Sequence, residues 1–247
     1  MLRDNIYTNN LTIGYDSHIV QKELTFALHG GELVTMLGRN GCGKSTLLHT
    51  LAGLIPPISG DYTIGGEGEP ERRLALVLTE RVSLENTKVF DVVAMGRYPY
   101  TNAMGRLQAE DTETIMRSLA AVGLDATRAD GKAYKDIFFN DLSDGEKQRV
   151  LIAKALAQQT PVILLDEPTA HLDLPNRIQV LRLLRTLAHE QQKTILLSTH
   201  ELDLALQLSD RILLMSKQGV ALDTPANLKA QDAFDRAFGM NVFNIKL

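Results

Sequence analysis

Short apolar segments alternate with helical patterns along much of the chain, and this alternation predicts an α/β fold. Residues 33–37, 162–165 and 194–197 are apolar runs of the length and composition expected of buried strands. Between the last two runs, residues 180–187 place valine and leucine at the i, i+4, i+7 spacing of one helix face. Strands that alternate with helices predict a parallel sheet that binds ligands at the carboxyl ends of its strands.

The first third of the chain has a different pattern. Its apolar segments at residues 11–13, 24–28 and 62–64 are separated by turn signals such as the glycine pair at 30–31. We expect these segments to form an antiparallel β layer. The glycine-rich and acidic segment at residues 65–70 is typical of a solvated turn.

Residues 89–156 have few β-branched runs and are predicted to be helical. Helical patterns cover residues 111–122 and 146–158, and a polar connection lies at about 125–135. The chain has no internal repeat and no long linker rich in glycine, serine or proline. We therefore expect one domain over residues 1–247, with a helical subdomain inserted at about 89–157.

Composition narrows the function classes. The formal charge of −4 argues weakly against nonspecific nucleic-acid binding, which usually needs a basic excess. No apolar run approaches the ~20 residues that span a bilayer, and the amino terminus lacks the apolar segment of a secretory signal, so we expect a cytoplasmic chain. A single cysteine excludes an internal disulfide and a cysteine zinc site.

The most specific motif is a glycine-rich segment directly after the expected strand at residues 33–37. It matches the G-x-x-x-x-G-K-[ST] pattern of a loop whose backbone amides close around nucleotide phosphates. Its residues are Gly38, Arg39, Asn40, Gly41, Cys42, Gly43, Lys44, Ser45 and Thr46. We expect Lys44 to supply a cation, Ser45 to offer a hydroxyl to Mg²⁺, and the helix expected at 45–54 to direct its positive end at the anion. The chain is predicted to bind ATP or GTP.

The single cysteine, Cys42, lies inside this loop and has two interpretations. It is a small side chain tolerated between glycines, or a thiol made acidic by backbone amides and Lys44, in which case alkylation inactivates the protein.

Two carboxylates follow the expected strand at residues 162–165. Asp166 is placed to hold the Mg²⁺ ion met by Ser45, through water. Glu167 is placed to orient and deprotonate the water that attacks the γ-phosphate. Together with the phosphate loop, this pair predicts a nucleotide hydrolase.

The segment Leu142-Ser143-Asp144-Gly145-Glu146 resembles the LSGGQ signature of ATP-binding cassette (ABC) proteins. The resemblance covers nearly the whole chain. It implies a P-loop NTPase (RecA-like) core with a parallel sheet, an N-terminal antiparallel β layer and an inserted helical subdomain. Residues 1–247 would then be a single ABC nucleotide-binding domain that binds ATP and Mg²⁺.

In that family two cassettes dimerise head to tail. The resemblance therefore implies a homodimer in which Ser143, the backbone amides that follow it, including that of Gly145, and the helix dipole close on the γ-phosphate of the partner chain. It also implies that Tyr15 stacks on adenine and that Asp173 is the polar anchor of a dimer-contacting loop. His171 receives no role. His200, after the strand at 194–199, matches the switch histidine that senses the γ-phosphate and holds the attacking water.

Two positions depart from the family pattern. The family's Q-loop glutamine, which touches Mg²⁺ and the transporter partner, aligns with Thr79. We hypothesise that Thr79, with Glu80, replaces the missing amide oxygen through a water, which would complete a metal set of Ser45, Asp166 and Thr79. The second departure is Asp144 in place of glycine. Aspartate tolerates left-handed backbone better than most residues, but its carboxylate must point away from the phosphates.

The segment Met95-Gly-Arg-Tyr-Pro-Tyr100, with residues 167–173, is similar to the ATPase subunits of importers for ferric siderophores, haem and cobalamin. This similarity implies a membrane permease dimer as partner, contacted around residues 79–100, and indirectly an extracytoplasmic substrate-binding protein. It implies a peripheral location on the cytoplasmic face of the inner membrane and no nucleic-acid partner. Two alternatives remain open: a soluble cassette ATPase acting on DNA or ribosomes, and a regulatory nucleotide-binding module without turnover. For residues 79–100, a helix end with aromatic packing is the other interpretation.

Overall fold

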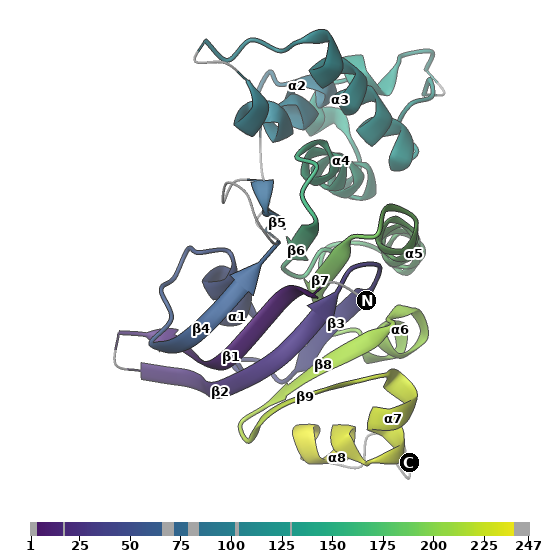
Figure 1. Ribbon diagram of the computed structural model, residues 1–247. Helices are drawn as coiled ribbons and strands as arrows, with labels where there is room; N and C mark the ends of the chain where they lie inside the picture. The colour runs from purple at the N-terminus through teal and green to yellow at the C-terminus, as the bar shows by residue number, and fades with distance from the viewer. Residues whose placement is uncertain are drawn as a thin grey trace.

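The computed structural model describes residues 4–16, 18–65, 72–78, 84–101, 104–128 and 130–239. Within these residues the strands form two sheets, a smaller one in the order β2-β1-β4 and a larger one in the order β5-β6-β7-β3-β8-β9 (Figure 1). The strands are β1 (Asp4–Tyr15), β2 (His18–His29), β3 (Leu33–Gly38), β4 (Ser59–Ile64), β5 (Leu74–Val77), β6 (Val162–Leu165), β7 (Thr194–Ser198), β8 (Arg211–Ser216) and β9 (Gly219–Asp223).

The larger sheet is parallel from β5 to β8, and only β9 runs antiparallel to its neighbour. Residues of β3, β6 and β7 are buried on both faces of the sheet, which explains why their sequences are continuous apolar runs rather than alternating ones. Because these three strands are parallel neighbours, their carboxyl ends reach the same edge of the sheet.

The smaller sheet is antiparallel, and its strands β1 and β2 are long but irregular. The pairing register between β1 and β2 shifts at several points, and Glu23 in the middle of β2 has a left-handed backbone with φ 56°. Helix α1 (Lys44–Leu51) packs between the two sheets, because Leu47 and Leu48 belong to a core cluster that also contains residues of β1 and β2 and of the larger sheet.

Helices α2 (Val89–Ala94), α3 (Ala109–Ala121) and α4 (Asp144–Ala157) gather at one end of the molecule, beyond β5 and β6 (Figure 1). The 3₁₀ helix η2 (Met95–Tyr100) directly continues α2. These helices share one apolar core with α5 (Leu174–Gln191) and with one face of the larger sheet. Helices α6 (Leu202–Leu208), α7 (Pro225–Ala230) and α8 (Ala233–Phe238) cover β8 at the opposite end. Two short 3₁₀ turns, η3 (Tyr134–Asp136) and η4 (Phe139–Asp141), precede α4.

The predicted fold class is confirmed: a parallel sheet, an antiparallel layer and a helical segment between β5 and β6 are all present. The predicted elements needed two kinds of correction. Helix α1 ends at Leu51 rather than at residue 54, since Gly53 has a left-handed backbone, and β5, β8 and β9 were not predicted. The division into domains stays a prediction. Most of the turn expected at residues 65–70 lies outside the described residues, as do Thr79 and Glu80.

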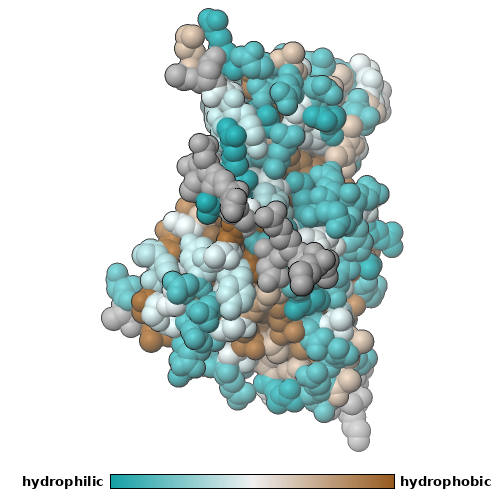
Figure 2. All heavy atoms as spheres, in the orientation of Figure 1, coloured by the Kyte–Doolittle hydropathy of each residue, from teal (hydrophilic) through white to brown (hydrophobic). Residues whose placement is uncertain are grey.

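Among the described residues, no helix has both the length and the apolar character that a membrane span requires. Figure 2 shows hydrophilic surface over most of the helical end, with hydrophobic surface gathered around the middle of the molecule.

Candidate functional site

The glycine-rich loop joins the carboxyl end of β3 to the amino end of α1 and depends on left-handed backbone at two residues. Gly41 has φ 76° and Gly43, the N-cap of α1, has φ 102°. A Cβ atom on Gly43 would lie 2.7 Å from Cγ1 of Val20, and one on Gly38 would lie 2.4 Å from the carbonyl oxygen of Met215. Glycine is therefore required at position 38 for the close approach of β8, and at position 43 both for the left-handed backbone and for the approach of β2.

Lys44 is 6% exposed and curls back over the loop. Its Nζ donates hydrogen bonds to the carbonyl oxygens of Gly38, at 2.9 Å, and Arg39, at 3.5 Å. The ammonium group is thus held at the loop itself, where it adds a fixed positive charge to the partial charge of the α1 amino terminus.

The two acidic residues after β6 are both hydrogen-bonded to a serine of β7. The hydroxyl of Ser198 donates to Oδ1 of Asp166 at 2.6 Å and accepts from the backbone N–H of Glu167 at 2.8 Å. Glu167 has a left-handed backbone with φ 43°, and its carboxylate forms a short hydrogen bond with Nε2 of His200. A left-handed glutamate costs energy that its surroundings must offset, and such strain is commonly found at functional sites.

An open cavity of about 640 Å³ brings most of the predicted site residues together. Its lining includes Tyr15, Asn40, Gly41, Gly43, Lys44, Ser45, Thr46, Glu167 and His200. Gly38 and Cys42 belong to the loop but do not line the cavity, and Asp166 does not line it either but is linked to Glu167 through Ser198. Ser143 and Gly145 are not among the residues that line this cavity.

At the edge of the cavity, Tyr15 is half exposed, and its hydroxyl oxygen accepts a hydrogen bond of 3.4 Å from Thr46. An exposed aromatic ring beside the phosphate loop can stack on a nucleobase. His18, which pairs with Tyr15 across the β1–β2 turn, and Val20 also line the cavity.

Cys42 is 7% exposed, and burial raises the pKa of its thiol even though Lys44 and nearby backbone N–H groups act in the opposite direction. Of the two interpretations of this residue, the structure supports the small packing side chain, since a thiol with a raised pKa reacts slowly.

Ser143 is an exposed N-cap at the start of α4, and its polar atoms are bonded within its own segment. Its backbone N–H and its hydroxyl each donate to Oε2 of Glu146 at 2.8 Å, and the hydroxyl of Tyr134 donates to Oε1 at 2.9 Å. Burial opposes ionisation of Glu146, but these hydrogen bonds outweigh it and lower the pKa of the carboxyl. Asp144 is the first residue of α4, so the left-handed backbone that aspartate tolerates is not needed at this position.

The starts of α4 and α5 lie close together where Gly145 approaches Asn176. A Cβ atom on Gly145 would lie 2.8 Å from Oδ1 of Asn176, so a larger residue at this position would displace the Asn176 side chain. Asp173 caps α5 and accepts a 3.0 Å hydrogen bond from the backbone N–H of Asn176. Among the described residues, no hydrogen bond or ion pair gives His171 a role.

In the segment at residues 95–100, some side chains are buried and others are exposed. Arg97 is 3% exposed, forms a 2.8 Å ion pair with Asp111, and lies 3.8 Å from the ring centroid of Tyr100. Tyr98, in contrast, is 66% exposed. The aromatic-packing interpretation therefore fits Tyr100, while Tyr98 presents an apolar ring to solvent.

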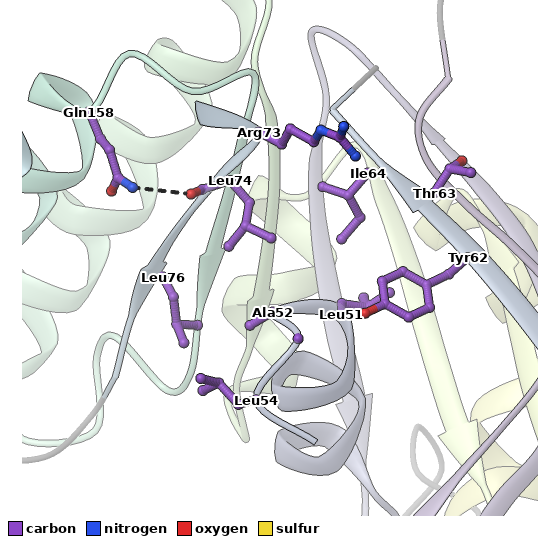
Figure 3. Close-up of a pocket in the computed structure, with 11 residues that line it drawn as sticks. Leu51, Ala52, Leu54, Tyr62, Thr63, Ile64, Arg73, Leu74, Leu76 and Gln158 are labelled. Atoms are coloured by element: carbon purple, nitrogen blue, oxygen red, sulfur yellow. Dashed lines mark hydrogen bonds between the residues drawn. The ribbon is translucent and has the colours of Figure 1, made fainter. Parts of the chain in front are cut away.

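A second open cavity, of about 760 Å³, lies between the end of α1, β4 and β5 (Figure 3). Leu54, Tyr62, Ile64 and Leu76 give it apolar walls, and Gln158 on its rim donates a 3.3 Å hydrogen bond to the carbonyl oxygen of Leu74. Leu54 is 60% exposed, so the cavity opens onto apolar surface.

Sequence reasoning missed two polar residues close to the loop, Gln21 and Ser198. Ser198 lies in the strand predicted before His200. Its position opposite Asp166 is visible only once β6 and β7 are paired. Gln21 gives no signal in the sequence, because a lone glutamine in an alternating strand is expected to be solvated.

Comparison with known proteins shows what this chain is similar to. A model of the ABC transporter family matches residues 21–170. An uncharacterized ABC transporter ATP-binding protein of Methanocaldococcus jannaschii is 37% identical over 245 residues, which cover 96% of this chain and 82% of the relative. The petrobactin import ATP-binding protein FpuD of Bacillus anthracis is 34% identical over 246 residues, covering 97% of this chain and 86% of FpuD.

The fold is similar to that of a solved structure whose sequence is also related. An inward-facing conformation of a putative metal-chelate type ABC transporter contains a chain with a TM-score of 0.84 and 30% identity, and the match covers 96% of this chain and 90% of that chain. The cobalamin import ATP-binding protein BtuD of Halobacterium salinarum is 37% identical over 225 residues, which are 87% of this chain and 54% of that protein.

Proposed function

This chain belongs to the ABC transporter family, and from that premise we propose that it is the ATPase subunit of an importer for a metal chelate of the ferric siderophore, haem or cobalamin class. The family and its ATP-binding relatives make the chain an ATP-binding ATPase. Relatives named for import of petrobactin, ferric enterobactin and cobalamin support the cargo class.

The observation that carries the proposal is one cavity lined by Lys44 on one side and by the hydrogen-bonded pair Glu167 and His200 on the other. A triphosphate cradled by the loop would extend toward this pair. Glu167 would then orient the attacking water and accept its proton, and His200 would hold the γ-phosphate end of the nucleotide. Ser198 would keep the Asp166 carboxylate and the backbone of Glu167 in place.

The oxygen donors beside the loop fit Mg²⁺. The Ser45 hydroxyl and the Asp166 carboxylate are hard oxygen donors, and Mg²⁺ is usually held by one or two such groups together with substrate phosphates and waters. The described residues contain no cluster of three or more His, Cys, Asp or Glu side chains that would hold a metal without nucleotide. When bound, Mg²⁺ would neutralise phosphate charge. Thr79, also proposed as a donor, lies outside the described residues.

We place Ser143 and Gly145 against the nucleotide of a second copy of this chain. Ser143 is exposed and does not line the cavity of its own chain, while α4 carries a positive amino terminus beside it. A head-to-tail homodimer would therefore complete two sites, each with the loop of one copy and the signature segment of the other.

The permease is proposed to dock on the apolar cavity at the end of α1 and on the exposed ring of Tyr98. Apolar surface of this kind marks interaction sites, and the coverage by a membrane partner would bury Leu54. The chain would then work at the cytoplasmic face of the membrane, with an extracytoplasmic binding protein acting through the permease.

Two measurements test the proposal. Wild type should release phosphate from ATP, and Glu167→Gln should lower kcat by about 10²- to 10⁴-fold while still binding ATP. Equal and negligible rates in both proteins would favour the regulatory module instead. Copurification of a permease, followed by uptake assays with iron chelates, haem and cobalamin, tests the importer role, and its failure with turnover intact would favour a soluble cassette ATPase.

A further inference from the structure

Gln21 is a buried polar residue directly beneath the phosphate loop. It is 5% exposed, and its Nε2 donates to the carbonyl oxygen of Cys42 at 2.9 Å and to that of Ser216 at 2.7 Å. We propose that Gln21 is a positioning residue that fastens the phosphate loop to the turn between β8 and β9 and thereby sets the affinity for ATP. This inference rests on the phosphate-binding role of the loop proposed above.

The loop is enclosed between strands of the two sheets. On one side, Gly38 is so close to Met215 of β8 that a Cβ atom would lie 2.4 Å from the Met215 carbonyl oxygen. On the other side, a Cβ atom on Gly43 would lie 2.7 Å from Val20 and 3.4 Å from Cγ of Gln21. Packing confines the loop on both sides, and Gln21 adds the directed hydrogen bonds that packing cannot supply.

Gln21 also joins the two sheets at the nucleotide end of the molecule. It belongs to β2 in the smaller sheet, while Ser216 ends β8 in the larger one. Other side-chain hydrogen bonds between the sheets lie at the far end of these strands, where Arg211 donates to the carbonyl oxygen of Ala27 at 3.2 Å and Asn5 donates to Thr194 at 3.0 Å. Loss of Gln21 would therefore loosen the sheets where the loop lies between them.

The bond to Cys42 fixes the direction of a peptide group. In a trans peptide the C=O and the following N–H point in opposite directions. Anchoring the Cys42 carbonyl on Gln21 therefore directs the N–H of Gly43 away from Gln21, where a phosphate oxygen can accept from it. Without this anchor the peptide is free to rotate, and the amide no longer has a fixed orientation toward the anion.

The test compares Gln21→Met, which keeps the length of the side chain but removes both donors, with Gln218→Met on the neighbouring turn, where the glutamine is exposed. We expect Gln21→Met to raise the Kd for ATP about 10- to 100-fold, as expected from the loss of two buried hydrogen bonds. The KM for ATP should rise in parallel, with kcat at saturation changed less than about threefold. Gln218→Met should match wild type in every measurement.

The rate of Cys42 alkylation without nucleotide gives a readout that does not depend on ATP. It should increase at least about tenfold in Gln21→Met, because a loosened loop exposes the thiol. ATP affinity and alkylation rate within twofold of wild type would overturn the proposal. If Gln21→Met does not unfold cooperatively, Gln21→Asn takes its place. This variant keeps the amide group on a shorter side chain, so we expect an intermediate effect on ATP affinity and alkylation rate. Values within twofold of wild type would again overturn the proposal. A wild type that fails to bind ATP, with alkylation still accelerated in the variant, would refute the nucleotide role and leave the attachment of the loop established.

Discussion

The carboxyl ends of β3, β6 and β7 and the amino end of α4 both carry polar residues suited to a nucleotide, but they are constructed in different ways. At the strand ends, Lys44, Glu167 and His200 face an open cavity, and Glu167 adopts a left-handed backbone. At α4, the hydroxyl of Ser143 is bonded to Glu146 of the same turn, and Ser143 does not line that cavity.

The strand ends therefore form a binding cavity, whereas the polar groups at the start of α4 already have hydrogen-bond partners in their own turn. At the strand ends, charged side chains and a strained backbone face an open cavity in which a ligand can bind. The start of α4 is a capping box that is stable alone and presents its hydroxyl and helix dipole outward. A site assembled from both would require two molecules, with each region of one copy completed by the other region of its partner.

The largest effect is expected from mixing two variants that each damage one region. Ser143→Arg places a bulky cation where the partner's phosphates would lie, and Lys44→Ala removes the loop cation, so each alone should lose hydrolysis by at least about 100-fold. An equal mixture should recover about a quarter of wild-type activity, since half of the dimers would contain one intact site of two. Phosphate release measured before and after mixing checks this, and no recovery would argue against sites shared between copies.

The helical end of the molecule, which carries Ser143, contains a buried ion pair between Arg97 of η2 and Asp111 of α3. The strands of the larger sheet are instead stabilised by apolar packing. Asp111→Asn should lower the free energy of unfolding by about 3–5 kcal/mol, because it leaves Arg97 charged and buried without its partner. Denaturant unfolding of this variant and of Glu110→Gln, an exposed neighbour on α3, provides the comparison. Equal stability of the two variants would contradict the prediction.

The same ion pair predicts acid sensitivity. Burial opposes ionisation of Asp111, but hydrogen bonds from the Gln108 N–H and from Arg97 outweigh it and lower the pKa of the carboxyl. A carboxyl with a lowered folded pKa contributes stability above its unfolded pKa of about 4, and that contribution is lost as the pH falls. The stability difference between wild type and Asp111→Asn should therefore shrink in acid.

A buried lysine gives a second dependence of stability on pH, of the same sign but in the alkaline range. Lys193 donates to the carbonyl oxygen of Thr160 at 2.6 Å, and burial lowers its pKa to about 8. Between pH 8 and the unfolded pKa of about 10.4 the unfolded chain binds the extra proton, so folding stability rises with pH in this window. Wild type should gain about 3 kcal/mol relative to Lys193→Met between pH 7 and 10.5 in urea unfolding, and parallel curves for the two proteins would refute the assignment.

The smallest effect is expected at the capping box itself. Glu146→Gln keeps an acceptor for Ser143, so the free energy of unfolding should change by less than about 1 kcal/mol at pH 7 and turnover should be nearly unaffected. Because the pKa of Glu146 is lowered in the folded chain, wild type should lose stability relative to this variant as the pH falls. A large loss of turnover at pH 7 would show that the charge of Glu146 takes part in the site.

Sequence patterns were most informative where structure is local. Strand β6 was predicted at its observed bounds, and the loop between β3 and α1 is recognised from adjacent residues, since its geometry follows from the glycines themselves. The length of α1 was less well predicted, because continuing apolar residues extended the pattern past Gly53.

The remaining features depend on distant pairing. Gln21 meets Ser216 across 195 positions of the chain, and nothing near either residue indicates the other. The apolar run of β8 was missed although it neighbours β3, the strand that leads into the phosphate loop. Ser198 gains its role only because β6 and β7 align their ends. Such contacts are decided by sheet order, which no local pattern specifies.

The irregular strand β2 has a consequence for how the protein behaves at high concentration. It is an outer strand of its sheet and is 12 residues long, a length that would offer a second molecule a continuous row of unpaired backbone groups. The left-handed turn of the chain at Glu23 breaks that row and places a charge at the break. Intermolecular β-pairing along this edge is thereby disfavoured, which protects the chain from strand-mediated aggregation.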